Sequence, residues 1–167
     1  MGLLEKPDTS RSTVDAARFN EKGIEETRRR HFDEGIEALR AAIRSDRKQP
    51  AYWNNLGSVY LTIDKPILAS RCFRRAIGID PNNALAWYNL GAARDALLDY
   101  DGAIENYARA LELDPSLRNV SKNPSVVNNT HMAAISLTLY RKQAGALGAP
   151  LSSPGSHTEG RPAERQK

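Results

Sequence analysis

Apolar residues recur along the middle of the chain at intervals of three and four. In residues 84–97 the recurring positions are Leu85, Trp87, Leu90, Ala93 and Leu97. This spacing places one apolar stripe along one face of a helix, because an α-helix makes a turn every 3.6 residues. The pattern predicts amphipathic helices, each of which buries its stripe against a neighbouring helix.

Turn and cap residues divide these helical stretches into pairs. Pro66 suits the first turn of a helix, where its missing backbone N–H is not needed, and Asp99 is placed to cap the helix that follows it. The segments that begin with Asp80-Pro81 and Asp114-Pro115 end the second helix of each pair. We therefore expect helix-turn-helix units.

The same units repeat with a period of thirty-four residues. Residues 50–83 align with residues 84–117 at Trp53 and Trp87, Leu56-Gly57 and Leu90-Gly91, Ala69 and Ala103, Phe73 and Tyr107, Ala76 and Ala110, and Asp80-Pro81 and Asp114-Pro115. Residues 16–49 form a more divergent copy, with Phe19 at the tryptophan position and Gly23 at the glycine position. Lys22 replaces the leucine, which is tolerable in a terminal repeat because one neighbour is missing. Small Gly91 and Ala103 predict a close approach of the paired helices.

This order of Trp, Leu-Gly, Ala, aromatic, Ala and Pro resembles the tetratricopeptide repeat. The stretches AYWNNLGSVY and LAWYNLGAARD are close to the consensus of that family. The resemblance implies an all-α fold, a right-handed superhelical solenoid of three helix-turn-helix repeats with a C-terminal capping helix. It divides the chain into an N-terminal segment (1–15), three repeats (16–49, 50–83 and 84–117), a linker with the C-terminal helix (118–148), and a tail (149–167).

The period breaks after Leu117. Residues 125–144 predict one more helix, which either caps the last repeat or binds a partner. Residues 149–167 are rich in Pro, Gly and Ser and poor in large apolar residues, so we expect them to be disordered. Seven basic and two acidic residues give residues 118–167 a net charge of +5, although the whole chain carries only +4. The basic run Arg28-Arg29-Arg30 ends a helix, where it either offsets the helix dipole or binds anions.

Composition and residue inventory argue against several classes of function. The chain offers His31, His131, His157 and the single Cys72, and no two of these histidines lie three or four residues apart. We therefore expect no enzyme activity, no metal site and no cofactor. No apolar stretch is long enough to cross a membrane, so we expect no membrane insertion. No aromatic residues are interleaved with the basic run, so we expect no binding of nucleic acid. One cysteine forms no intrachain disulfide, which suits a cytoplasmic protein.

In tetratricopeptide arrays the first helix of each pair lines a concave groove. The resemblance places the following residues in it: Asn20, Ile24, Asn54, Ser58, Leu85, Tyr88 and Ala92. We expect Asn54 and Tyr88 to be partly exposed and to contact a partner. Members of the family that bind chaperone tails use lysines, asparagines and an arginine to clamp a terminal carboxylate. Ile24, Leu85 and Tyr88 stand where several of those groups are needed, which argues against a clamp here.

The sequence therefore favours a protein-protein interaction module, a scaffold or adaptor that binds a peptide or a helix of a partner protein in this groove. The alternative is a small dedicated chaperone for a secreted client. In size and repeat number the chain is similar to the translocator chaperones of type III secretion. Both interpretations predict a protein or peptide partner.

Overall fold

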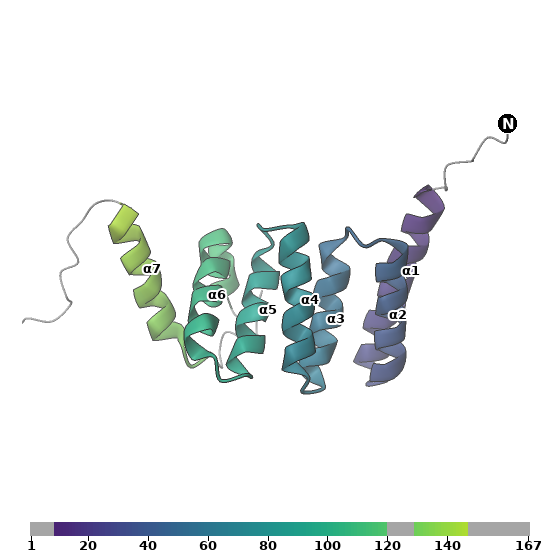
Figure 1. Cartoon of the computed structure of the whole chain (residues 1–167), viewed down its shortest axis with the longest axis horizontal. Coiled ribbons are helices and arrows are strands. Elements are labelled where there is room, and N and C mark those ends of the chain that lie inside the picture. The colour runs from purple at the N-terminus through teal and green to yellow at the C-terminus, as the bar shows by residue number, and fades with distance from the viewer. Residues whose placement is uncertain (1–8, 120–128, 147–167) are drawn as a thin grey trace, which may run out of the picture.

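The protein is a row of paired helices in the computed structural model, which describes residues 9–119 and 129–146 (Figure 1). The helices are α1 (Thr9–Arg28), α2 (Phe32–Ser45), α3 (Pro50–Thr62), α4 (Pro66–Ile79), α5 (Ala84–Asp95), α6 (Tyr100–Leu113), the short 3-10 helix η1 (Pro115–Arg118) and α7 (Met132–Ala146). Regular structure in these two ranges is entirely helical. The predicted all-α solenoid of three helix pairs is confirmed.

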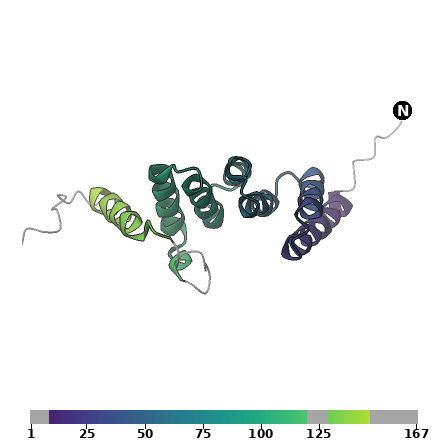
Figure 2. The same cartoon turned by 90° about the horizontal axis from the view of Figure 1, so that it is seen from below.

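The pairs stack so that the array has two faces. Seen as in Figure 2, α1 and α3 lie along one side of the row, and α2 and α4 lie along the other. Each pair packs against the next through its second helix, α2 on α3 and α4 on α5. The first helices therefore line one face and the second helices line the opposite face.

Local signals set the helix boundaries as predicted. The Asp99 carboxylate accepts the backbone N–H of Gly102 at 3.2 Å and caps α6, and Pro66 occupies the first turn of α4. Asp80 and Asp114 follow the last residues of α4 and α6. Asn83, which the sequence analysis did not single out as a cap, accepts the N–H of Ala86 at 3.0 Å and begins α5.

Glycines allow the helices of each pair to approach closely. A Cβ atom on Gly57 would lie 2.6 Å from the Phe73 ring, and one on Gly91 would lie 2.7 Å from the Tyr107 ring. Both distances are shorter than van der Waals contact, so the rings occupy the space that a side chain would need. The predicted close approach is confirmed.

The first pair keeps this contact in a modified form. A Cβ atom on Gly23 would lie 2.6 Å from Leu39, which takes the place of the aromatic ring. Lys22 is exposed, as expected for a charged residue at the leucine position of a terminal repeat. Helix α1 begins at Thr9, upstream of residue 16, where the sequence period places the start of the first repeat.

Two tryptophans join consecutive pairs. The indole N–H of Trp53 donates to the carbonyl oxygen of Arg47 at 3.1 Å, and that of Trp87 donates to the carbonyl oxygen of Pro81 at 2.9 Å. Both side chains are half-buried, and Trp87 packs against the apolar clusters on both sides of it. Each indole therefore fixes the loop that leads into its own helix.

The C-terminal helix begins later than predicted. Residues 129–131 form a turn, and α7 starts at Met132, so a continuous helix over residues 125–144 is wrong for this part. The cause is local: the Asn129 side-chain oxygen accepts the backbone N–H of His131 at 3.0 Å, a bond that competes with helix. The other predicted helix residues before Asn129, and the predicted disordered tail, lie outside the described residues.

Helix α7 covers the last pair. Its Ile135 and Leu139 are buried in one cluster with Tyr107 and Leu111. This packing is what a capping helix requires, since it removes the exposed apolar face of α6 from water.

Helix α7 also runs in the same direction as α6. Near its start, His131 Nε2 lies 3.0 Å from Asp95 Oδ1 and its ring packs beside Tyr100, the first residue of α6. Further along, Lys142 Nζ lies 3.1 Å from Glu112 Oε1 at the end of α6. Consecutive helices elsewhere in the row are antiparallel, so α7 does not begin a fourth repeat.

The contact with Lys142 also changes the acidity of Glu112. Partial burial opposes ionisation of Glu112, but hydrogen bonds from Lys142 and Arg109 outweigh this effect and lower its pKa.

The glycine contact predicts opposite effects for two alanine substitutions. Gly91→Ala should lower the free energy of unfolding by about 1 to 3 kcal/mol, because the new methyl group forces the Tyr107 ring to move. Gly78 in α4 has no atom within 4 Å of a built Cβ, so Gly78→Ala should be neutral or stabilising by up to about 1 kcal/mol. Urea denaturation of both variants checks this, and equal effects would contradict the proposed contact.

Candidate functional site

Two of the predicted groove residues meet in a hollow between α1 and α3. The hollow has a volume of about 180 Å³ and is lined by Ile24, Thr27, Leu39, Asn55, Ser58, Val59 and Thr62. Ile24 and Ser58 were predicted as partner-binding residues, and the structure brings them together across neighbouring repeats. We call this surface the α1–α3 groove.

Hydroxyl groups in the α1–α3 groove bond to their own helices. The hydroxyl of Thr27 donates to the carbonyl oxygen of Gly23 at 2.8 Å, and that of Thr62 donates to the carbonyl oxygen of Ser58 at 2.9 Å. Ser58 donates in the same way to Asn54 at 3.0 Å. These bonds use the hydroxyl protons, so the oxygens keep lone pairs for a partner's N–H groups. The seven lining residues carry no formal charge, so the groove is polar but neutral.

Asparagine pairs connect the first helices beside this groove. Asn55 Nδ2 donates to Asn20 Oδ1 at 2.8 Å, and Asn89 Nδ2 donates to Asn54 Oδ1 at 3.0 Å. The first bond joins α1 to α3 and the second joins α3 to α5. Asn54 is only 7% exposed, so the expectation that it is partly exposed is wrong. Asn54 is buried because α3 and α5 lie close enough for its side-chain oxygen to accept the hydrogen bond from Asn89.

Tyr88 is buried, and the expectation of partial exposure is wrong for it as well. The residue is 2% exposed, and its ring centroid lies 4.8 Å from that of Tyr107. Its hydroxyl oxygen accepts the side-chain N–H of Asn129 at 3.4 Å. Burial raises the pKa of Tyr107, with smaller contributions from Asp95 and Tyr88. Tyr88 is buried because Asn129 bonds to its hydroxyl and because its ring belongs to the apolar cluster that Ile135 and Leu139 of α7 complete.

The other predicted groove residues divide between the open and the covered part. Asn20 is half-buried beside the α1–α3 groove, where it bonds to Asn55. Ala92 is half-buried against the cluster that α7 completes. Leu85 is 47% exposed in the first turn of α5. The face of the first helices is therefore open over α1 and α3 and partly covered over α5.

One signal in the sequence could have indicated this covering. Asn20, Asn54 and Tyr88 stand at corresponding positions of the three repeats. The first two have polar side chains, and the third has a large ring that is stabilised by burial. Asn129 and His131, which tie the start of α7 to α5, were missed because they lie outside the period.

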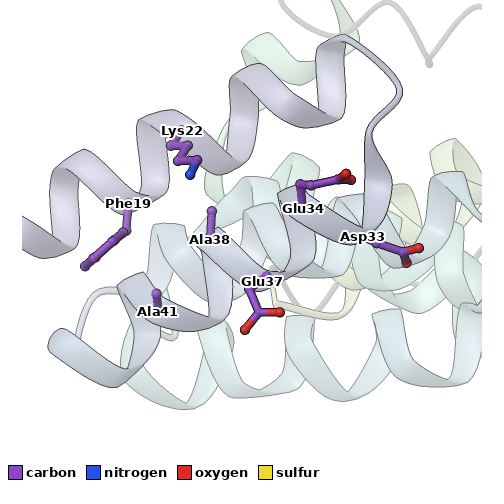
Figure 3. A pocket seen from close by; sticks show the side chains of 7 residues that line it. All are labelled: Phe19, Lys22, Asp33, Glu34, Glu37, Ala38 and Ala41. Carbon is purple, nitrogen blue, oxygen red and sulfur yellow. The ribbon is translucent and has the colours of Figure 1, made fainter.

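A second hollow lies between α1 and α2 at the N-terminal end of the row. It measures about 420 Å³ and is lined by Phe19, Lys22, Asp33, Glu34, Glu37, Ala38 and Ala41 (Figure 3). Phe19 stands at the tryptophan position of its repeat, but no described element packs over it as α2 packs over Trp53. The hollow follows from the terminal place of this repeat, and its acidic residues all come from α2.

The side chains considered for catalysis or metal binding lie apart. His31 Nδ1 lies 2.9 Å from Glu26 Oε2 in the first turn between helices, and this hydrogen bond contributes most to lowering the pKa of Glu26. Cys72 is buried, and burial raises the pKa of its thiol to about 11. His157 lies outside the described residues. Within the described ranges no three His, Cys, Asp or Glu side chains gather as metal ligands, and no helix has the length and apolar character to cross a membrane.

Comparison with known proteins identifies the repeats. Family models of the tetratricopeptide repeat match residues 20–66, 50–83 and 84–117. Protein O-mannosyl-transferase TMTC3 of Homo sapiens is 35% identical over 99 residues, which are 58% of this chain and 11% of that protein. RNA polymerase II-associated protein 3 of Xenopus tropicalis is 34% identical over 94 residues, 56% of this chain and 14% of that protein. The chain thus spans a small part of the length of these relatives.

The matches to solved structures of similar fold extend over nearly the whole of each solved domain. The first TPR domain of Spaghetti (RPAP3), bound to the HSP90 peptide SRMEEVD, has a TM-score of 0.61 and 26% identity, and the match covers 82% of this chain and 96% of that one. The first TPR domain of human RPAP3 has a TM-score of 0.63 and 27% identity, with 77% and 95% covered.

The burial of Tyr88 predicts a loss of stability on truncation. Tyr88→Ala should lower the free energy of unfolding by about 3 to 5 kcal/mol, as for other buried aromatic residues. Tyr88→Phe keeps the ring and removes only the long bond to Asn129, so it should cost less than about 1 kcal/mol. Chemical denaturation followed by circular dichroism measures both. A Tyr88→Ala protein as stable as the wild type would show that the ring is not part of the core.

Proposed function

We propose a role as a protein-protein interaction module for this chain, which belongs to the tetratricopeptide repeat family. In this proposal an extended peptide of a partner protein binds in the α1–α3 groove. The main support is the combination, in one hollow, of an exposed apolar side chain with hydroxyl and amide groups. An extended peptide needs both, because its backbone carries N–H and C=O groups and its side chains need apolar contacts.

Each part of the groove has a proposed task. Ile24, which is 38% exposed, contacts an apolar side chain of the peptide. The hydroxyl oxygens of Thr27 and Ser58 accept peptide N–H groups. The Asn20–Asn55 bond leaves the NH2 group of Asn20 as a donor and the carbonyl oxygen of Asn55 as an acceptor. Leu85 adds a second apolar contact where the open face reaches α5.

The wider proposal is a scaffold or adaptor that works in the cytoplasm. The single Cys72, which is unpaired, suits a reducing compartment, where a free thiol persists. The solved TPR domain of Spaghetti, with its bound HSP90 peptide, is a similar fold that holds a peptide, which supports the peptide-binding proposal.

Peptides selected from a displayed library on the full chain test the groove. Ile24→Asp should weaken their binding about tenfold or more, because it places a charge against an apolar contact. Ile67→Asp is the matched control: Ile67 is 59% exposed on α4, away from the groove, so its substitution should change binding less than about twofold. Fluorescence anisotropy gives the affinities.

Two results would contradict the proposal. One is a set of selected peptides that bind the Ile24→Asp protein as tightly as the wild type. The other is an equal loss with Ile67→Asp, which would indicate a general effect of added negative charge. Circular dichroism of both variants shows whether the fold is intact.

The neutral groove also predicts how the peptide SRMEEVD behaves. No lysine or arginine lines the α1–α3 groove, so the groove offers a terminal carboxylate no positive partner. The free-acid and the C-terminally amidated forms of this peptide should therefore bind equally weakly. Calorimetry of the two forms checks this. A preference of about tenfold or more for the free acid would show that a carboxylate clamp exists.

A further inference from the structure

The opposite face of the array carries a concentration of positive charge. Three adjoining hollows, the largest of about 570 Å³, lie between α2 and α4 and share Trp53 of α3 as a lining residue. Their lining includes the following arginines: Arg40, Arg44, Arg47, Arg71, Arg74 and Arg75. We call these six residues with Trp53 the arginine hollow.

Helical spacing explains how the charges meet. Arg40, Arg44 and Arg47 follow at four and three residues, so they share one side of α2 and its exit loop. Residues 71, 74 and 75 share one side of α4 in the same way. Because α2 and α4 flank α3, the two stripes face one another across Trp53.

These charges have no acidic partner in the surroundings that the structure describes. The residues that line the three hollows include no carboxylate. The arginines in described ion pairs lie elsewhere, at the end of α1 and just after it, on α5 and on α6. Arg40 donates to the Tyr60 hydroxyl at 2.7 Å and Arg74 donates to the Ser70 hydroxyl at 3.2 Å, and both of these acceptors are neutral. Six like charges this close repel each other and lower stability.

The repeat architecture does not require most of these arginines, although Arg40 and Arg75 match arginines one period later. One period later, around Trp87, the positions that match Arg44 and Arg71 hold Gly78 and Glu105. The position that matches Arg74 holds Ala108. The same packing therefore forms without a positive charge at these three positions, so a structural role does not explain Arg44, Arg71 and Arg74.

We propose that the arginine hollow binds an acidic peptide segment of a partner protein. The carboxylates of the segment pair with the guanidinium groups, which suit bidentate binding. An aromatic or aliphatic side chain of the same segment packs on the apolar part of the hollow, where Ile43, Leu56 and Leu68 surround Trp53. This site lies on a different side of α3 from the α1–α3 groove and does not depend on it.

Charge and apolar area together favour a peptide over other anions. Single-stranded nucleic acid is held by several aromatic residues that stack on successive bases. The hollow offers one half-buried indole, because Tyr60, the other aromatic residue in its lining, is only 5% exposed. A second copy of the chain is the other acidic candidate, since Asp33, Glu34 and Glu37 line the same N-terminal hollow as Phe19 (Figure 3). Both of these occupants are outcomes of the test below.

The probe is a fluorescein-labelled, glutamate-rich peptide with a central Phe, alongside a neutral twin with Gln for each Glu. Arg44→Glu with Arg71→Glu should weaken binding of the acidic peptide about tenfold or more. The control pair is Arg18→Glu with Arg141→Glu, which makes the same change in net charge at exposed positions outside the hollow. It should change affinity less than about twofold, and the neutral twin should bind about tenfold more weakly or not at all.

Two further measurements place the peptide. In a Trp87→Phe background Trp53 is the remaining tryptophan, so the acidic peptide should change its emission. Raising salt from about 0.05 M to about 0.3 M should weaken this binding, because the Debye length shortens. The variants Arg44→Glu and Arg71→Glu replace exposed side chains and should fold, which circular dichroism checks.

Three outcomes would overturn the proposal. The first is an equal loss of affinity with the control pair, which would mean diffuse attraction. The second is a single strand of oligothymidine that binds more tightly than the acidic peptide. The third is self-association in analytical ultracentrifugation that Arg44→Glu with Arg71→Glu abolishes, which would assign the hollow to a second copy of the chain.

Discussion

The contact between a glycine of one helix and a ring of the next sets the geometry of this array. Gly57 meets Phe73 and Gly91 meets Tyr107 at distances that leave no room for a side chain. The rings are almost fully buried, and each contact fixes how the two helices of a pair cross. Because the contact recurs every thirty-four residues, the pairs stack in register. One face of the row then belongs to the first helices and the other to the second helices.

The two proposed sites follow from this division and differ in their chemistry. Helix α3 contributes to both, since Asn55 and Ser58 line the neutral groove while Trp53 lines the arginine hollow. Residues two apart on a helix point in nearly opposite directions, so one helix can serve two surfaces. An adaptor with a neutral groove and a basic outer face could hold two segments at once, one recognised by apolar and hydrogen-bonding groups and one by charge.

The sequence predicted what depends on local or periodic features. The helix ends at Asp80 and Asp114, the cap at Asp99 and the close approach at Gly91 all follow from residues within one repeat. The burial of Asn54 and Tyr88 did not follow, because it depends on Asn89 in the next repeat and on a helix after the period ends. The arginine hollow was missed for a related reason. Its charges lie on separate helices, and only the stacking of α2 and α4 around Trp53 brings them together.

The central claim is that the two faces act as separate sites, and side-chain NMR signals test it most directly. The amide groups of Asn20 and Asn55 report on the groove, and the indole N–H of Trp53 reports on the outer face. A neutral peptide selected on the full chain should shift the asparagine signals and leave the Trp53 indole unchanged. An acidic peptide should do the reverse. Shifts of both sets of signals with either peptide, or of neither set, would contradict the account.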